Sequence, residues 1–176
     1  MKPERFSAWV AGQNEQYAAE KVKSGAWPAE GALERAKAEF ASLLPSGIDT
    51  PRNHILDIFA VTGSPQSHHP SEERIGTVWL AQAPFGKAPN HGWIFDVEID
   101  VAFRGRGFGR ATMTALEDYA RAQGITEIGL HVFGQNPGAQ ALYAGLGYGV
   151  TGISMLKRLA PAAWTCRVRL SDWSPS

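Results

Sequence analysis

Three consecutive patterns between residues 93 and 124 constrain the fold most. Apolar and polar side chains alternate from 93 to 99, which is typical of a β-strand. A glycine-rich turn follows, with the sequence Arg104-Gly105-Arg106-Gly107-Phe108-Gly109-Arg110. Helical spacing then runs from about 107 to 123 and ends at Gly124, a residue suited to the left-handed position after a helix. A strand that leads through a glycine turn into a helix predicts an α/β domain.

The rest of the chain supplies the other elements of such a domain. Helical spacing predicts two helices within residues 6–44, with Pro28 in the first turn of the second. Further strands are predicted at 54–61, 75–81, 125–133 and 148–159. A short helix is predicted to begin after the N-cap Asn136 and to end at Gly147. We therefore expect an α/β (α+β) fold with a mixed sheet in one domain, 1–176.

Composition excludes several classes of protein. The 176 residues carry 17 basic and 17 acidic side chains, without the basic excess that is usual in proteins that bind duplex nucleic acid. No apolar run approaches the ~20 residues of a membrane span. The single cysteine, Cys166, rules out multi-cysteine metal sites, and the adjacent His68 and His69 are poorly placed to chelate. We expect a cytoplasmic protein with no metal, no nucleic-acid partner and no membrane partner.

The glycine-rich turn has the features of an anion site. Backbone N–H groups at a helix N-terminus bind phosphate, and flanking arginines add charged hydrogen bonds. A Walker loop would require Gly-Lys-Ser/Thr, which is absent, and a dinucleotide fingerprint would require glycine where Arg110 stands. An ordinary tight turn is the remaining alternative. If the turn binds a ligand, that ligand should carry a pyrophosphate or several phosphates.

Two motifs together resemble the GNAT superfamily of N-acetyltransferases, which use acetyl-CoA. The first is Arg104-x-x-Gly107-x-Gly109, and the second is Asn136-x-x-Ala139-x-x-Leu142-Tyr143-x-x-x-Gly147-Tyr148. The resemblance implies a mixed, mostly antiparallel central sheet that is flanked by helices and splayed between its two central strands. It divides the chain into N-terminal helices (1–52), a sheet and cofactor core (53–159) and a C-terminal tail (160–176).

The resemblance also implies how acetyl-CoA would bind. The pantetheine arm would pair with the backbone of the strand before the glycine turn and would touch Asn136, while the pyrophosphate would lie on the amides of 106–110. Tyr143 would approach the thioester sulfur. The implied cofactor-binding residues are Ile99, Val101, Arg104, Arg106, Gly107, Phe108, Gly109, Arg110, Asn136 and Tyr143.

The expected chemistry is direct transfer of an acetyl group to an amine. A primary amine with a pKa of ~10.4 must lose a proton before it attacks, so a carboxylate base is needed, with Glu98 preferred and Asp96 second. Asp100 is expected to neutralise nearby arginines. Tyr143 would protonate the leaving thiolate, although a tyrosine on an apolar helix face is often a core residue. A backbone N–H within 97–99 would stabilise the oxyanion. His131 is expected to be structural rather than part of the acceptor pocket.

These observations predict an acetyl-CoA-dependent N-acetyltransferase whose acceptor is a small-molecule or peptide amine. Two alternatives stay open at this point: a non-catalytic acyl-CoA sensor or interaction module, and a nucleotide-dependent oxidoreductase. Alternation from 165 to 170 predicts one more strand in the tail, which would extend the sheet or pair with a second subunit in a homodimer.

Overall fold

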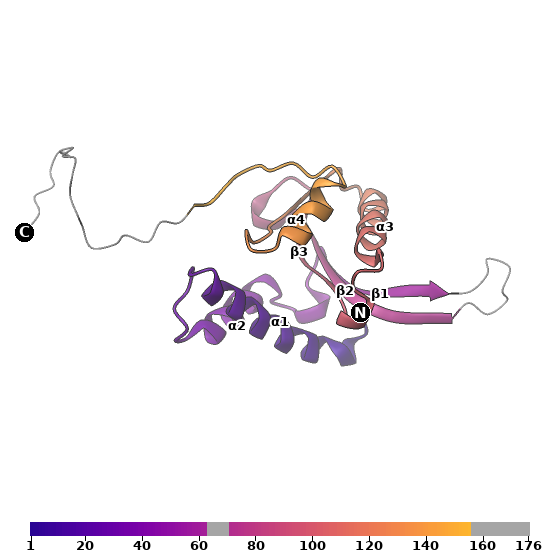
Figure 1. Cartoon of the computed structure of the whole chain (residues 1–176). Coiled ribbons are helices and arrows are strands. Elements are labelled where there is room, and N and C mark those ends of the chain that lie inside the picture. Colours follow the sequence, from indigo (N-terminus) through magenta and orange to yellow (C-terminus); the bar gives the residue numbers. More distant parts are fainter. Residues whose placement is uncertain (63–70, 156–176) are drawn as a thin grey trace, which may run out of the picture.

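The computed structural model describes residues 1–62 and 71–155 as a sheet with helices on both faces (Figure 1). The helices α1 (Pro3–Lys23) and α2 (Ala32–Leu43) cover one face. The helices α3 (Phe108–Ala122) and α4 (Pro137–Ala144) cover the other. Three short 3-10 turns lie at Gly47–Asp49, Pro84–Gly86 and Val101–Phe103. No helix in these two ranges is both long and apolar enough to cross a membrane.

The sheet has four strands in the order β1-β2-β3-β4. β2 (Ser71–Gln82) pairs antiparallel with both β1 (Asn53–Thr62) and β3 (His91–Ile99), whereas β4 (Glu127–Leu130) runs parallel to β3. The predicted mixed, mostly antiparallel sheet is therefore confirmed. The β3–β4 ladder ends at the pair Ile94–Leu130, while β3 continues to Ile99 with β2 as its neighbour in the described chain. The sheet thus opens beside the second half of β3.

A bulge in β3 changes the predicted alternation. Trp79 of β2 is opposite Asp96, but the next residue, Leu80, is opposite Ile94, so Phe95 is an extra residue in β3. An extra residue of this kind places two successive side chains on one face. Phe95 and Asp96 consequently both face the α1/α2 side, where they line one cavity. The prediction that apolar and acidic side chains of 93–100 lie on opposite sides was wrong at this point.

Two apolar clusters hold the layers together. On the α3/α4 face the buried residues are Val78, Leu80, Ile94, Met113, Leu116, Ala120 and Ile125. On the α1/α2 face they are Phe40, Leu44, Ile55 and Trp79. Each buried large side chain of this kind stabilises the fold by about 1.5–3 kcal/mol relative to an exposed one. The two clusters fix the helices on either side of β3, which is the strand that carries the candidate site.

The structure corrects several predicted boundaries. The second helix begins at Ala32 and not near Pro28, and the strand predicted at 125–133 is only Glu127–Leu130. Residues 148–155 form no strand, and the remainder of the predicted strand, 156–159, lies outside the described residues. Helical spacing predicts that α3 turns Phe108, Ala111, Ala115, Leu116 and Tyr119 inward, which was partly wrong, because Ala111 and Ala115 are exposed. The histidine pair 68–69 and the tail 160–176 also lie outside the described residues.

Candidate active site

The glycine-rich turn leads from β3 into α3 with a backbone that requires glycine. Gly105 and Gly107 have φ of 73° and 83°, in the left-handed region that other residues rarely adopt. Gly107 is the N-cap of α3, and no side chain caps the helix there. The first amides of α3 therefore remain available to an anion, and the helix dipole favours negative charge at this end. The turn has the backbone geometry that the sequence predicts for an anion site.

Arg104 connects the turn to the end of β3. Its Nε donates a hydrogen bond to the carbonyl oxygen of Ile99 at 2.7 Å, and its Nη2 lies 3.3 Å from a carboxylate oxygen of Glu98. Asp100 was expected to neutralise the arginines of the turn, but it forms an ion pair with Arg74 of β2 at 2.7 Å. Of the three carboxylates at the end of β3, Glu98 and Asp100 are thus engaged by arginines.

The other two arginines of the turn have different surroundings. Arg106 lies over two phenylalanine rings, 5.2 Å from the centroid of Phe108, and has no ion-pair partner among the described residues. Arg110 donates a hydrogen bond to the carbonyl oxygen of Gly145 at 3.1 Å. Arg110 therefore joins α3 to the end of α4, and Arg106 is the freer cation beside the anion site.

Asp96 is the most perturbed carboxylate of the site. Its pKa is raised from 3.8 to about 7, chiefly because burial disfavours the charged form, and also because of the negative charges of Glu98 and Glu20. A backbone hydrogen bond from Val97 opposes this effect. Its Oδ2 atom is buried without a hydrogen-bond partner in the described chain. A buried carboxylate with a pKa near neutrality and a free oxygen has the properties of a general base.

Tyr143 lies on α4 at the point where the sheet opens. Its ring packs against the α3/α4 cluster, 5.8 Å from the ring of Tyr148. Burial raises the pKa of the Tyr143 hydroxyl, and the charge of Asp96 raises it further. Tyr143 is thus a core residue by its ring, while its hydroxyl lies within the electrostatic reach of Asp96.

Asn136 caps α4 as the sequence predicts. Its side-chain oxygen accepts a hydrogen bond from the backbone N–H of Ala139 at 3.1 Å. The side-chain NH₂ group is not used by this cap. Its predicted contact with pantetheine remains a prediction, as does the pairing of that arm with the backbone of Ile99 and Val101.

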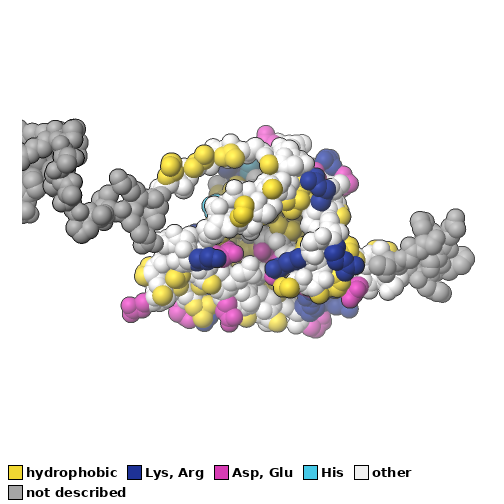
Figure 2. All heavy atoms as spheres, viewed as in Figure 1, with side chains coloured by type: hydrophobic (Ala, Val, Ile, Leu, Met, Phe, Trp, Pro, Cys, Tyr) yellow, Lys and Arg dark blue, Asp and Glu magenta, His cyan; other side chains and the backbone are white. Residues whose placement is uncertain are grey.

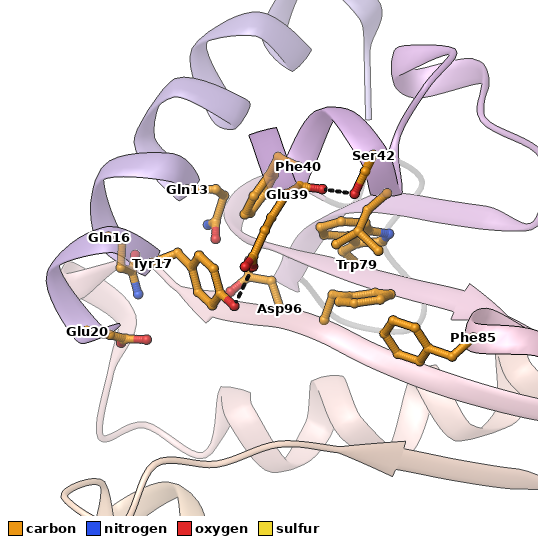
Figure 3. A pocket seen from close by; sticks show the side chains of 12 residues that line it. Gln13, Gln16, Tyr17, Glu20, Glu39, Phe40, Ser42, Trp79, Phe85 and Asp96 are labelled. Carbon is orange, nitrogen blue, oxygen red and sulfur yellow. Dashed lines mark hydrogen bonds between the residues drawn. The ribbon is translucent and has the colours of Figure 1, made fainter. Parts of the chain in front are cut away.

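A cavity of about 320 Å³ lies between the α1/α2 layer and β3 (Figure 3). Its lining residues are Gln13, Gln16, Tyr17, Glu20, Glu39, Phe40, Ser42, Leu43, Trp79, Phe85, Phe95 and Asp96. Asp96 faces Tyr17 and Glu39 across the cavity in Figure 3. Acidic side chains are also visible in the hollow between the α1/α2 layer and the α4 side in Figure 2. The charge of Glu20 raises the pKa of Asp96, and the charge of Asp96 raises the pKa of Tyr143, so Asp96 is within electrostatic reach of both residues.

Most of this cavity was not predicted from the sequence. From the sequence, core packing explains the aromatic residues of the first two helices, and the alternative is that some of them wall the acceptor site. In the structure Tyr17 and Phe40 line the cavity, whereas Trp9 and Trp27 do not. His131 was expected to be partly buried, but it is exposed and lies against the ring of Phe133. The signal that could have located the cavity is the set of acidic and glutamine residues on the same faces of the first two helices as the aromatic residues.

Comparison with known proteins identifies the family. The family described as Acetyltransferase (GNAT) family matches residues 51–148, more than half of the chain. The chain belongs to the GNAT family of acetyltransferases. This membership confirms the resemblance drawn from the two motifs, and it favours the acetyltransferase over the dinucleotide interpretation of the glycine-rich turn.

Two Bacillus subtilis proteins are similar to this GNAT protein over most of their length. The uncharacterized N-acetyltransferase YycN is 31% identical over 159 residues, which cover 90% of this chain and 96% of YycN. The uncharacterized N-acetyltransferase YdgE is 29% identical, with 90% and 95% covered. The crystal structure of YycN matches the fold with a TM-score of 0.79, over 92% of this chain and 96% of that one. These similarities extend the GNAT assignment to the N-terminal helices that wall the cavity.

Proposed function

We propose that this protein transfers an acetyl group from acetyl-CoA directly to a primary amine, and that the amine binds in the cavity beside Asp96. The cavity and the glycine-rich turn lie on either side of the second half of β3, where the sheet opens. This arrangement allows the two substrates to enter from different sides and to meet near Asp96 and Tyr143. Holding the two substrates next to each other makes the transfer step effectively unimolecular, which lowers the entropic part of its barrier.

The residues at the glycine-rich turn fit a diphosphate. An added Cβ at Gly105 or at Gly107 would meet no atom within 4 Å, so the turn faces open space. The backbone N–H groups at the start of α3 would donate hydrogen bonds to the diphosphate oxygens, and the exposed guanidinium of Arg106 would neutralise part of the diphosphate charge. The NH₂ group of Asn136 would donate to a pantetheine amide. Bound acetyl-CoA supplies the activated acetyl thioester.

Asp96 is proposed as the base in preference to Glu98. A base has to exchange protons near neutral pH, and the pKa of Asp96 is raised to about 7. Glu98 is paired with Arg104, so its carboxylate is already engaged by a cation. Asp96 would accept one proton from the ammonium form of the substrate, either directly or through water. The neutral amine then attacks the thioester carbonyl.

Tyr143 is proposed as the acid that protonates the leaving thiolate. Its raised pKa keeps the hydroxyl protonated before the reaction. When Asp96 takes up the amine proton, the negative charge that raises the pKa of Tyr143 disappears, so the hydroxyl becomes more acidic as the thiolate leaves. Tyr143 gives its proton to sulfur and regains one from the nitrogen that becomes the amide. Asp96 releases the remaining proton to solvent, so one proton is released in each turnover.

The observation that carries this proposal is the position of Asp96, with its raised pKa, between the cavity and Tyr143 in a GNAT fold. The test is release of free CoA thiol from acetyl-CoA, with a panel of amines and purified protein. Acceptor-dependent release together with an acetylated product supports the proposal. Tight acetyl-CoA binding by calorimetry without transfer to any amine would instead indicate an acyl-CoA-binding module. A protein that binds no CoA species would contradict both.

A further inference from the structure

The cavity beside Asp96 is lined by acidic groups from three elements. Glu20 comes from α1, Glu39 from α2 and Asp96 from β3, and none of the described lining residues is Lys or Arg. Neither Glu20 nor Glu39 has an ion-pair partner within residues 1–62 and 71–155. Within the described residues, the carboxylates that line the cavity therefore have no lining cation and no ion-pair partner to neutralise them.

Lys21 does not form an ion pair with either Glu20 or Glu39. Lys21 follows Glu20 in sequence, but its ammonium group lies over the rings of Tyr17 and Trp27, at 5.0 and 5.5 Å from their centroids. Glu39 accepts a hydrogen bond from the hydroxyl of Tyr17 at 2.9 Å (Figure 3). A neutral donor of this kind orients the carboxylate and leaves its charge in place. Glu39 is thus held toward the cavity with its negative charge available.

The apolar part of the cavity is a wall of aromatic rings. Trp79 and Phe95 stack with centroids 4.4 Å apart, and Phe85 packs edge-on against Phe95 at 5.7 Å. Phe85 is 69% exposed and has a φ of 55°, a conformation that is unfavourable for a phenylalanine. Strained residues of this kind occur where function requires a side chain in a given place. Aromatic faces attract ammonium groups and also cover a hydrocarbon chain.

We propose that the amine acceptor is a small diamine that carries two positive charges at neutral pH. This inference rests on the proposed function. The ammonium group that reacts lies at Asp96, and the second lies at Glu20 and Glu39. The hydrocarbon between the two nitrogens contacts Phe85 and Phe95, which Trp79 supports from the core. The volume of about 320 Å³ suits a compact molecule, since small-ligand sites start near ~300 Å³.

The second ammonium group also acts on the base. The charge of Glu20 contributes to the raised pKa of Asp96. A cation bound at Glu20 offsets that charge, so more of Asp96 is ionised and ready to accept a proton when a diamine is bound. A monoamine leaves Glu20 without a partner, so it binds more weakly. The fraction of Asp96 that is ionised is also smaller when a monoamine is bound.

The test compares acceptors that differ only in their second group. Acetyl transfer is measured by CoA thiol release for three acceptors. At neutral pH, 1,4-diaminobutane carries a second cation, butylamine carries no second charge, and 4-aminobutanoate carries an anion. The expected order of kcat/KM follows that sequence, with a loss of about tenfold or more at each step. Equal rates for the diamine and the monoamine, or a faster reaction with a peptide amine, would overturn the proposal.

Isosteric variants locate the second subsite. Glu20→Gln and Glu39→Gln should each reduce the ratio of diamine to monoamine kcat/KM, by about tenfold when combined. Glu15→Gln is the matched control, because Glu15 lies on the same helix but is exposed and does not line the cavity. A ratio that is unchanged in the double variant, with the thermal unfolding of the variant also unchanged, would contradict the assignment.

Direct binding separates this inference from the proposed function. Calorimetry measures the affinity of 1,4-diaminobutane for the protein and for the Glu20→Gln/Glu39→Gln variant. Binding that needs both carboxylates supports the ligand class even if no acetyl transfer is found, an outcome that would reject the transferase proposal alone. Transfer to other amines, with no diamine binding, would reject the diamine and leave the transferase proposal intact.

Discussion

The carboxylate of Asp96 lies close enough to the hydroxyl of Tyr143 for its charge to raise the pKa of that hydroxyl. One group comes from a bulged strand and the other from a short helix, and both lie where β3 and β4 part. A protonated tyrosine and a carboxylate with a pKa near neutrality form a matched acid and base. The relationship gives each of them a role that substitution can test.

Tyr143→Phe should lower kcat by about 10²-fold or more, because the leaving thiolate loses its proton donor. KM for acetyl-CoA should change little, since the ring and its packing are retained. Steady-state kinetics of thiol release measure both. Tyr148→Phe is the matched control, as its ring is 5.8 Å from that of Tyr143 and its substitution should leave kcat near that of the unmodified protein. Equal effects in the two variants would argue against an acid role for Tyr143.

The pH dependence of kcat/KM should identify the base. If Asp96 accepts the proton, the profile rises with pH through about 7, the pKa of its carboxyl group. Asp96→Asn should lower the rate by about 10²-fold or more and remove this rise. Glu98→Gln should keep activity and move the rise to lower pH, because a charge that raises the pKa of Asp96 is gone. The opposite pattern would make Glu98 the base.

The same carboxyl group should make the fold less stable at high pH. The folded pKa of Asp96 lies above its ordinary value, so the folded state binds the proton more tightly than the unfolded state. Stability therefore falls as pH rises from about 4 to about 7, and then stays level. Asp96→Asn should match the unmodified protein near pH 4 and be more stable above pH 7, by at most about 4 kcal/mol. Urea unfolding at pH 4, 6 and 8 measures this, and a difference independent of pH would contradict it.

Local signals in the sequence predicted the turn and the short helix correctly. Gly105 and Gly107 adopt left-handed backbone conformations, and Asn136 caps its helix, because these preferences depend on the residue itself and its nearest neighbours. The two motifs that indicate the family consist of such positions. The local geometry of the turn and of the helix cap could therefore be predicted without the structure, although the contact of Arg110 with the end of α4 could not.

The acceptor half of the site depends on contacts between distant residues. The bulge that turns Phe95 and Asp96 to one face arises from pairing with β2, and alternation along β3 alone predicts the opposite. Alternation also gives no sign that the side chain of Arg104 folds back onto the strand and pairs with Glu98. Residues 148–155 of the predicted strand form no strand for a related reason, since alternation specifies a strand only where a neighbouring strand edge pairs with it.

Arg106→Ala should weaken acetyl-CoA binding by about tenfold, because the guanidinium of Arg106 is exposed beside the proposed diphosphate site and has no ion-pair partner in the described chain. The loss should shrink at high salt, as expected for an exposed charge. S-acetyl pantetheine lacks the diphosphate, so its KM should be the same in the variant and the unmodified protein. Arg110→Ala is a useful contrast, since its side chain holds the end of α4 and its loss should lower the melting temperature. If Arg106→Ala affected both donors equally, the cation would act on something other than the diphosphate.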